Sequence, residues 1–264
     1  MRFLDSTAGK IAAFAVVALL AFGVGILARS PAVVTPTTER AQVEAIIKDY
    51  LLKNPDVMRL ALEEMERHTQ AQEETRKQES VAKLSPQIFQ SKYQTVLGNP
   101  DGKIQLVEFF DYNCGYCKRA LNDLSQLMKD NPDLRVILKE FPVLGPGSVE
   151  AAQVAMALKK QIDPAKYWEF HQKLLGGSRG PVGKAQALAV AEEAGANLDR
   201  LQADMASADV RAGLGEVMNI AETLGLNGTP SYIVGSEIVV GAVGAEKLQD
   251  KISNLRKCGK TDCI

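Results

Sequence analysis

Two cysteines separated by two residues, Cys114 and Cys117 in the order Cys-Gly-Tyr-Cys, carry the clearest chemistry in the sequence. An apolar run that ends at Phe110 precedes them and a helical pattern follows, so the pair lies at a predicted strand-to-helix junction. At a helix start, unpaired backbone N–H groups and the positive helix end favour a thiolate on Cys114. Cys117 lies one turn further on, within reach of a disulfide. This arrangement predicts reversible thiol–disulfide exchange.

The composition limits the kinds of partner. The 264-residue chain is long enough for one sizeable domain and appendages. Its 31 basic and 32 acidic side chains leave a net charge of -1, so bulk charge gives no indication of nucleic-acid binding. The four cysteines form two close pairs, which suits an oxidising compartment. A zinc site would need a second pair of ligands, and histidine is scarce, so we expect neither a resident metal nor another cofactor.

An unbroken run of apolar residues and glycine covers residues 11–28, after Arg2 and Lys10. A helix of this length spans roughly 27 Å, close to the bilayer core of about 30 Å. The basic flank predicts a cytoplasmic N-terminus and export of the rest of the chain. Two interpretations remain, a cleaved signal peptide and a retained membrane anchor, and the lack of an A-x-A cleavage site favours the anchor. Both put Cys114 outside the cytoplasm.

The next segment is predicted to be helical. Residues 29–37, which contain two prolines, are expected to form an extended linker. Apolar residues then recur at helical spacing over residues 43–51, and an Asn-Pro-Asp sequence at residues 54–56 ends one helix and begins another. After Glu66 the chain is almost entirely polar. Two interpretations fit the short apolar stripes: they fold back on the main domain, or they mediate self-association as a stalk.

The main domain is predicted to begin near Gln87 with a β-α-β unit. Strands over residues 104–110 and 134–141 flank a helix over residues 114–130. Helical patterns then dominate, with predicted helices over residues 149–161, 164–175, 184–194, 198–206 and 210–224. A hairpin of two strands, over residues 231–234 and 237–241, and a last helix over residues 245–256 complete the domain.

These elements resemble the thioredoxin fold interrupted by a helical domain, as in the DsbA-like family of bacterial disulfide oxidoreductases. The resemblance covers about residues 100–256. It rests on residues 107–118 (Val-Glu-Phe-Phe-Asp-Tyr-Asn-Cys-Gly-Tyr-Cys-Lys) and on Gly-Thr-Pro at residues 228–230 before a strand. Residues 45–55 also resemble the N-terminal segment of the ScsC branch, which implies a helical oligomerisation stalk there.

The expected fold class is therefore α/β. We expect residues 1–37 to form a signal peptide or membrane anchor with a linker. Residues 38–86 would form the helical stalk. Residues 87–264 would form a DsbA-like thioredoxin domain, with its helical insertion at about residues 148–226.

The two cysteines have distinct expected roles. Cys114 is the candidate nucleophile, which attacks a substrate disulfide, and Cys117 is the resolving thiol. Gly115 and Tyr116 between them tune the pair and lie beside the substrate. Lys118 and Arg119 are expected to assist the thiolate if they lie on the same face.

The resemblance implies roles for three further residues. Pro230 matches the family's cis-proline, in a loop that packs beside the cysteines and pairs with the substrate peptide. Thr229 before it resembles the isomerase and reductase branches. Glu108 takes the position of a buried acid beneath the active site, where it would relay protons to Cys117. We expect Lys139 to be its partner.

Cys258 and Cys263 near the C-terminus allow two interpretations. We favour a local structural disulfide that clips the tail, over a second redox or metal-binding pair. The two histidines, His68 and His171, lie far apart in sequence and give little support to a Cys-His hydrolase.

We therefore expect an exported, periplasmic thiol–disulfide oxidoreductase that acts on cysteine-containing exported proteins, with isomerase or reductase activity favoured. It would form a homo-oligomer through residues 38–80, be held at the inner membrane by residues 11–28 if these are uncleaved, and react with a membrane redox partner protein. A dithiol oxidase is the alternative direction. Two other classes remain: a metal-tolerance protein that binds copper(I) through the two thiols, and an interaction module that uses the stalk alone.

Overall fold

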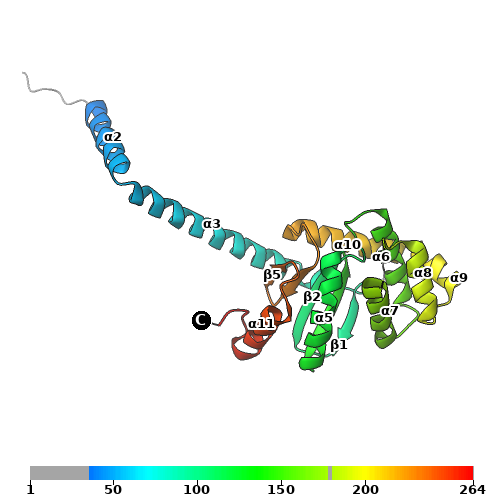
Figure 1. Ribbon diagram of the computed structural model, residues 1–264. Helices are drawn as coiled ribbons and strands as arrows, with labels where there is room; N and C mark the ends of the chain where they lie inside the picture. Colours follow the sequence, from blue (N-terminus) through cyan, green and yellow to red (C-terminus); the bar gives the residue numbers. More distant parts are fainter. Residues whose placement is uncertain (1–35, 178–179, 264) are drawn as a thin grey trace, which may run out of the picture. The chain divides into compact units, whose positions relative to one another are not determined.

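The computed structural model describes residues 36–177 and 180–263 (Figure 1). The predicted apolar segment at residues 11–28, and the linker as far as residue 35, lie outside the described residues. Contacts divide the chain into two compact units, with the boundary between Thr69 and Gln70. Within the described ranges, no helix is both long enough and apolar enough to cross a bilayer.

Two helices begin the described chain, α2 (Pro36–Lys53) and α3 (Pro55–Lys83). They are separated at Asn54, as predicted. The Asn54 side-chain amide donates to the Tyr50 carbonyl at 2.8 Å, and a proline at the start of α3 leaves no N–H unpaired. The expected linker was two residues too long, because a proline suits the first turn of a helix and α2 already begins at Pro36. The polar residues after Glu66 are helical throughout α3.

The second unit is built on a five-stranded sheet in the order β1-β3-β2-β4-β5. Its strands are β1 (Thr95–Gly98), β2 (Ile104–Phe110), β3 (Leu134–Glu140), β4 (Ser231–Val234) and β5 (Glu237–Val240). Strands β2 and β3 are parallel, and the other neighbouring strands are antiparallel. The sequence did not predict β1. Its four residues carry no periodic pattern and, unlike β4 and β5, they do not adjoin a partner strand across a tight turn.

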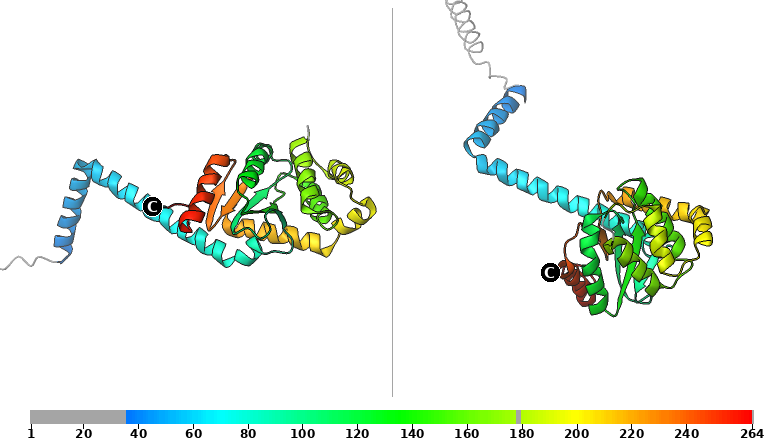
Figure 2. Two further views of the ribbon diagram at one scale, coloured as in Figure 1. Left: turned by 90° about the horizontal axis from the view of Figure 1, so that it is seen from below. Right: turned by 45° about the vertical axis from the view of Figure 1, so that its right-hand side comes forward.

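Helices cover both faces of this sheet (Figure 2). The helices of the unit after α3 are α4 (Ser85–Phe89), α5 (Gly115–Asp130), α6 (Pro146–Leu158), α7 (Pro164–Gly177), α8 (Lys184–Glu193), α9 (Leu198–Met205), α10 (Ala208–Leu224) and α11 (Ala245–Cys258). Along β2, Leu106 faces the cluster that contains α5 and α11, whereas Val107 faces the cluster that contains α4, α10 and the end of α3. This alternation follows from the two-residue period of a strand.

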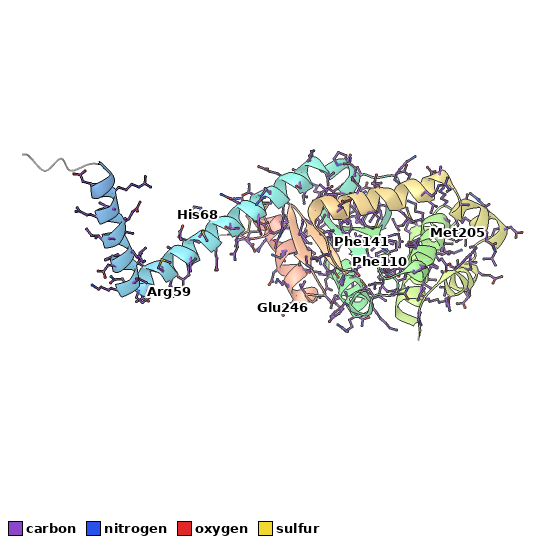
Figure 3. The ribbon with its side chains drawn as sticks, turned by 90° about the horizontal axis from the view of Figure 1, so that it is seen from above. Arg59, His68, Phe110, Phe141, Met205 and Glu246 are labelled. Atoms are coloured by element: carbon purple, nitrogen blue, oxygen red, sulfur yellow. A yellow bond between two sulfur atoms is a disulfide. The ribbon has the colours of Figure 1, made fainter. Side chains whose placement is uncertain are left out.

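The inserted helices α6 to α9 gather at one end of the sheet, where α7 contacts β1 and α5 (Figures 1 and 2). Figure 3 places Met205 of α9 among these helices, away from Phe110 and Phe141. The structure narrows the insertion expected at residues 148–226. The second half of α10 covers the sheet through Val217 and Ile220, so this helix belongs to the insertion only at its start.

The start of α10 approaches α6 at Gly213, which generates a stability prediction. A Cβ on Gly213 would lie 2.9 Å from the Cβ of Tyr93 and would overlap the end of Met156, whereas a Cβ on Gly215 would meet open space. Gly213→Ala should lower the free energy of unfolding by roughly 1 to 3 kcal/mol through overpacking. Gly215→Ala should raise it by about 0.5 to 1 kcal/mol, because glycine weakens a helix. Urea unfolding followed by circular dichroism measures both, and equal effects would contradict the close approach.

Candidate active site

Cys114 ends the loop after β2 and is the N-cap residue of α5. Its backbone is extended, with φ −82° and ψ 112°, and its Sγ accepts a hydrogen bond from the Cys117 backbone N–H at 3.2 Å. The sulfur thus occupies the place of an N-cap oxygen, at the positive end of the helix. Cys114 is only 5% exposed and Cys117 is fully buried; neither is in a disulfide.

The two thiols have opposite pKa shifts. The hydrogen bond from the Cys117 thiol contributes most to lowering the pKa of Cys114, which falls to about 6; the Thr229 side chain and the backbone N–H groups of Cys117 and Tyr116 act in the same direction, against burial. The pKa of Cys117 is raised, first by its bond to Cys114 and then by burial, with a contribution from the charge of Glu108. At pH 7, Cys114 is therefore mostly a thiolate while Cys117 keeps its proton.

The loop before β4 lies against Cys114. Its Thr229–Pro230 peptide bond is cis, and the Thr229 carbonyl oxygen lies 3.1 Å from Cys114 Sγ, where it accepts a hydrogen bond from the protonated thiol. The Gly241 N–H donates to the Pro230 carbonyl at 2.8 Å, which ties this loop to the residue that follows β5. The structure therefore brings the two sequence-predicted substrate-loop residues directly beside the candidate nucleophile.

The two residues between the cysteines form an exposed rim. Gly115 has open space where a Cβ would stand, and Tyr116 is 60% exposed. The Arg119 guanidinium lies over the Tyr116 ring, 4.2 Å from its centroid. The pKa of Cys114 is lowered by hydrogen bonds with Cys117, Thr229 and Tyr116. Lys118 lines the same cavity as Cys114.

Glu108 is a buried carboxyl on β2. It is 3% exposed, and the Tyr232 hydroxyl donates to its Oε1 at 3.4 Å. Burial raises the pKa of Glu108 to about 8; the bond from Tyr232 opposes this rise, and the charges of Cys114 and Asp123 add to it. Its charge in turn raises the pKa of Cys117. A carboxyl with a pKa near neutrality and electrostatic contact with a thiol can take up and release that thiol's proton.

Lys139 is not the partner of Glu108, and our expectation was wrong. Lys139 pairs in register with Phe109, and residues paired across strands share a face, so Lys139 and Glu108 point to opposite faces of the sheet. The Lys139 ammonium donates to the Gln87 carbonyl at 2.6 Å and lies 3.8 Å from Glu216. Lys139 lies opposite the residue after Glu108, and the sequence of β3 alone does not determine this strand register.

Asp111 anchors the loop that carries the cysteines, and sequence reasoning did not single it out. It is 2% exposed. Its carboxylate accepts hydrogen bonds from the N–H groups of Asn113 (2.7 Å), Val143 (2.8 Å) and Leu144 (2.9 Å), and from the Ser148 hydroxyl (2.7 Å). These bonds satisfy a buried charge and join the end of β2 to the start of α6. An acid directly after an apolar strand is the signal that would have identified it.

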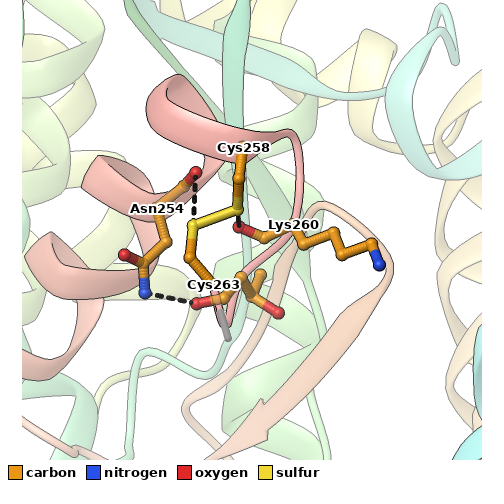
Figure 4. The surroundings of a disulfide bond; sticks show 5 residues. Asn254, Cys258, Lys260 and Cys263 are labelled. Atoms are coloured by element: carbon orange, nitrogen blue, oxygen red, sulfur yellow. Dashed lines mark hydrogen bonds between the residues drawn. A yellow bond between two sulfur atoms is a disulfide. The ribbon is translucent and has the colours of Figure 1, made fainter.

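Cys258, the last residue of α11, forms a disulfide with Cys263, with an S–S distance of 2.06 Å (Figure 4). The closed segment folds back along the helix, where the Asn254 side-chain amide donates to the Thr261 carbonyl at 2.8 Å. The two sulfurs lie 3.6 Å and 3.5 Å from the carbonyl oxygens of Lys260 and Asn254, so these contacts do not involve the candidate active site.

The histidines take no part in the site. His171 is buried, with its ring centroid 4.7 Å from that of Phe110 and its Nδ1 3.4 Å from the Tyr112 hydroxyl. Burial lowers the pKa of His171 to about 3, so the ring is neutral. His68 is exposed on α3, 3.1 Å from Glu64.

Comparison with known proteins puts this geometry in context. The family of the DSBA-like thioredoxin domain matches residues 105–253, more than half of the chain. The chain belongs to this DSBA-like family. The copper resistance protein ScsC N-terminal domain matches residues 39–72, which cover most of α2 and the first part of α3. The Cys114–Cys117 pair is accordingly that of a DsbA-family thiol–disulfide oxidoreductase.

Three solved structures illustrate the likeness. A thioredoxin-like oxidoreductase from Silicibacter pomeroyi is 39% identical and matches 66% of this chain and 98% of its own, with a TM-score of 0.62. A linker-deletion mutant of Proteus mirabilis ScsC is 25% identical and matches 86% of this chain and 99% of its own, with a TM-score of 0.63. A periplasmic thioredoxin-like protein from Salmonella enterica serovar Typhimurium is 26% identical over 65% of this chain and 94% of its own, with a TM-score of 0.58.

Curated relatives of the DSBA-like chain include proteins of different size. The Disulfide bond formation protein D of Bacillus subtilis is 25% identical, over 61% of this chain and 76% of its own. The Na(+)/H(+) antiporter NhaA 1 of Salinispora arenicola is 26% identical, over 60% of this chain and 24% of its own. The chain thus spans about a quarter of the length of the antiporter relatives that it matches.

The hydrogen bond between the two thiols predicts how Cys114 titrates. Alkylation of Cys114 by iodoacetamide, measured against pH, should have its midpoint near pH 6 in the native chain. Cys117→Ala removes the largest stabilising donor and should move the midpoint upward, toward the value of about 8.5 for an ordinary cysteine. Cys117→Ser keeps a donor and should move it less. Equal midpoints in the two variants would show that the Cys117 side chain does not stabilise the thiolate.

The raised pKa of Glu108 predicts a dependence of stability on pH. The folded state holds the Glu108 proton up to about pH 8, whereas the unfolded state releases it near pH 4.5. The stabilisation that this difference gives is therefore complete below pH 4.5 and is lost as the pH rises to 8. Glu108→Gln should therefore gain stability over the native chain progressively across this window, by at most about 5 kcal/mol. Denaturant unfolding at several pH values measures it. The exposed Glu246→Gln is the control, and a gain that does not vary with pH would contradict the assignment.

Proposed function

We propose that this protein is an exported thiol–disulfide oxidoreductase that acts on protein disulfides, with isomerase or reductase activity favoured. One observation carries the proposal. The Cys114 sulfur is held as a thiolate by hydrogen bonds at the start of α5, beside the cis Thr229–Pro230 bond and above a buried, protonated Cys117. A thiolate near neutral pH is the form that attacks a disulfide.

The geometry supports a two-step exchange. In the first step the Cys114 thiolate attacks one sulfur of a substrate disulfide; a mixed disulfide forms and the other substrate sulfur leaves as a thiolate. In reduction, Cys117 then loses its proton and attacks Cys114 Sγ, which releases the second substrate thiolate and leaves Cys114 and Cys117 joined. The ionised form of Glu108 is the proposed acceptor of the Cys117 proton, because it is buried and in electrostatic contact with that thiol; with a pKa of about 8, this form is the minor one at pH 7.

Isomerisation uses the first step and a different second one. A thiolate of the substrate itself attacks the mixed disulfide, so a new substrate disulfide forms and Cys114 is released as a thiolate. No net oxidation or reduction occurs. Thr229 before the cis-proline supports this direction, because the sequence here resembles the isomerase and reductase branches.

Oligomerisation through α2 and the start of α3 is part of the proposal. The described side chains of α2 are exposed or half-buried, although many are apolar. The large exposed apolar residues of these helices are Val43, Ile46, Ile47, Tyr50, Leu52, Val57, Met58, Leu60, Leu62 and Met65. A hollow of about 390 Å³ between the two helices is lined mainly by apolar side chains, among them the exposed Ile47, Leu52 and Met58. A second copy of the chain is the proposed cover, since apolar patches of this kind mark association sites.

Export to the periplasm rests on the apolar segment of residues 11–28 and on likeness to the Salmonella protein described as periplasmic. We propose that residues 11–28 hold the chain at the inner membrane. The substrates are cysteine-containing exported proteins, and a membrane protein resets the oxidation state of the Cys114–Cys117 pair.

An oxidase is the second candidate, and the same pKa favours it. A stabilised thiolate stabilises the reduced pair, which makes its disulfide a stronger oxidant. Copper(I) binding by the two thiols is a third candidate, suggested by the copper resistance domain that residues 39–72 match.

Refolding of a scrambled-disulfide protein tests the proposal and its oligomeric part together. The reduced native chain should speed the recovery of native disulfides, and Cys114→Ser should abolish the effect. Ile46→Glu should yield monomers in light scattering and lower isomerisation about fivefold or more, because neighbouring active sites no longer share one substrate. Gln42→Glu adds the same charge to an exposed polar position of α2 and should change neither.

Each other outcome favours one rival. Oxidation of a reduced substrate without rearrangement of a scrambled one would identify an oxidase. Protection of Cys114 from alkylation by stoichiometric copper(I), with no exchange activity, would identify a metal-binding protein. Activity that survives Cys114→Ser would exclude the thiol mechanism and leave the stalk as the functional part.

A further inference from the structure

Tyr232 is a buried tyrosine of β4, two residues after the cis-proline. It pairs in register with Glu108 across the two antiparallel strands, so the two side chains lie on the same face of the sheet. Helix α5, which carries Cys117, covers that face together with α11. The Tyr232 hydroxyl donates to Glu108 Oε1 at 3.4 Å. One strand therefore carries both the predicted substrate loop and a hydroxyl that is bound to the proposed proton acceptor.

The ionisable groups around Glu108 act in opposite directions. The hydrogen bond from Tyr232 favours the ionised carboxylate and lowers the pKa of Glu108. The charges of Cys114, at the start of α5, and of Asp123, within that helix, favour the protonated carboxyl and raise the same pKa. Cys117 is in turn affected by the charge of Glu108. The carboxyl thus lies between a donor on β4 and negative charges on α5.

Two buried lysines on neighbouring elements have other partners. Lys139 of β3 points to the opposite face of the sheet, and its ammonium donates to the Gln87 carbonyl. Lys251 of α11 donates to Glu237 at 2.8 Å, while α11 packs on the face of Glu108 through apolar side chains. Within the part of the chain that the structure describes, the Tyr232 hydroxyl is therefore the group that favours ionisation of Glu108.

The amount of ionised Glu108 sets the rate of the proposed resolving step. In that step the Cys117 proton moves to the Glu108 carboxylate, the Cys117 thiolate attacks Cys114 Sγ, and the substrate thiolate leaves. Because the pKa of Glu108 is about 8, the carboxylate is the minor form at pH 7. Its amount then changes almost in proportion to the ionisation constant, so a single hydrogen bond affects the rate directly.

We propose that Tyr232 is a positioning residue for the resolving step and that Asp123 opposes it. The Tyr232 hydroxyl fixes the Glu108 carboxylate and keeps part of it ionised, which speeds the transfer of the proton from Cys117. The Asp123 carboxylate, half-buried on α5, disfavours the ionised form and slows the step. The inference rests on the proposed function and adds two residues that set how long a mixed disulfide lasts. A longer-lived mixed disulfide gives a substrate thiol more time to attack, which favours isomerisation over reduction.

Stopped-flow reaction with dithiodipyridine tests this inference, because each step releases one light-absorbing pyridinethione. With the reduced native chain, the first phase reports attack by Cys114 and the second reports resolution by Cys117. At pH 7, Tyr232→Phe should slow the second phase about threefold to tenfold, move its pH midpoint upward and change the first phase little. Asp123→Asn should instead speed the second phase and lower its midpoint.

Matched controls separate this effect from a general change in packing. Tyr167→Phe removes a hydroxyl that donates to another buried carboxyl, Glu140, at 2.8 Å. Asp130→Asn neutralises an exposed carboxylate at the end of α5. Both controls should keep the native phases. In Glu108→Gln the second phase should be slow, and the addition of Tyr232→Phe should slow it no further.

The outcomes distinguish this inference from the proposed function. A native second phase in either Tyr232→Phe or Asp123→Asn would overturn the inference while exchange itself stands. Equal slowing of both phases in Tyr232→Phe, or further slowing when it is added to Glu108→Gln, would also overturn it, because Tyr232 would then act through the fold rather than through the carboxyl. Absence of both phases in the native chain would overturn the proposed function as well.

Discussion

The hydrogen bonds that converge on the Cys114 sulfur are the interaction on which the site depends. A thiolate in a pocket that is almost closed to water is unfavourable unless donors replace the lost solvent. Here the first turn of α5 supplies backbone N–H groups, and Cys117 supplies a thiol that its own bond to Cys114 and then burial keep protonated. The shift of each cysteine therefore depends on the other. This asymmetry separates the attacking sulfur from the resolving one.

Two buried carboxyl groups, Asp111 directly after β2 and Glu108 within that strand, have different roles because their surroundings differ. The Asp111 carboxylate accepts four hydrogen bonds and acts as a joint between the cysteine loop and α6. Glu108, three residues earlier, receives a bond from Tyr232 at 3.4 Å, and burial therefore favours its protonated form. The first is suited to hold a loop in place and the second to exchange a proton. Asn113 extends the same loop to Val182, so the nucleophile, the helical insertion and the cavity between them are connected as one structure.

Segments with a local periodic pattern were predictable. The errors concern contacts between residues that are far apart in the sequence. Strand β2 and the helix after it were found at their observed positions, because an apolar run and a helical stripe each need only local periodicity. Strand β1 was missed because its partner, β3, lies far along the chain and no tight turn joins the two. Lys139 was given the wrong partner because the face of a strand depends on its register. The partners of α10, which change along its length from α6 to the sheet, were not predictable from its helical pattern. Asp111 was overlooked because its role depends on hydrogen bonds with residues far along the chain, among them Val143 and Ser148.

The sequence by itself determined the kind of chemistry and the order of elements. A cysteine pair at a strand-to-helix junction is local information, and so are the proline that follows Thr229 and the paired cysteines near the C-terminus. Only the tertiary structure decided which groups meet. It brought the loop before β4 to within 3.1 Å of a sulfur more than a hundred residues earlier, gave Glu108 a buried site, and opened a cavity between Cys114 and the helical insertion. Distances between remote residues, and the pKa values that burial shifts, arise from packing, and no periodicity of the chain encodes them directly.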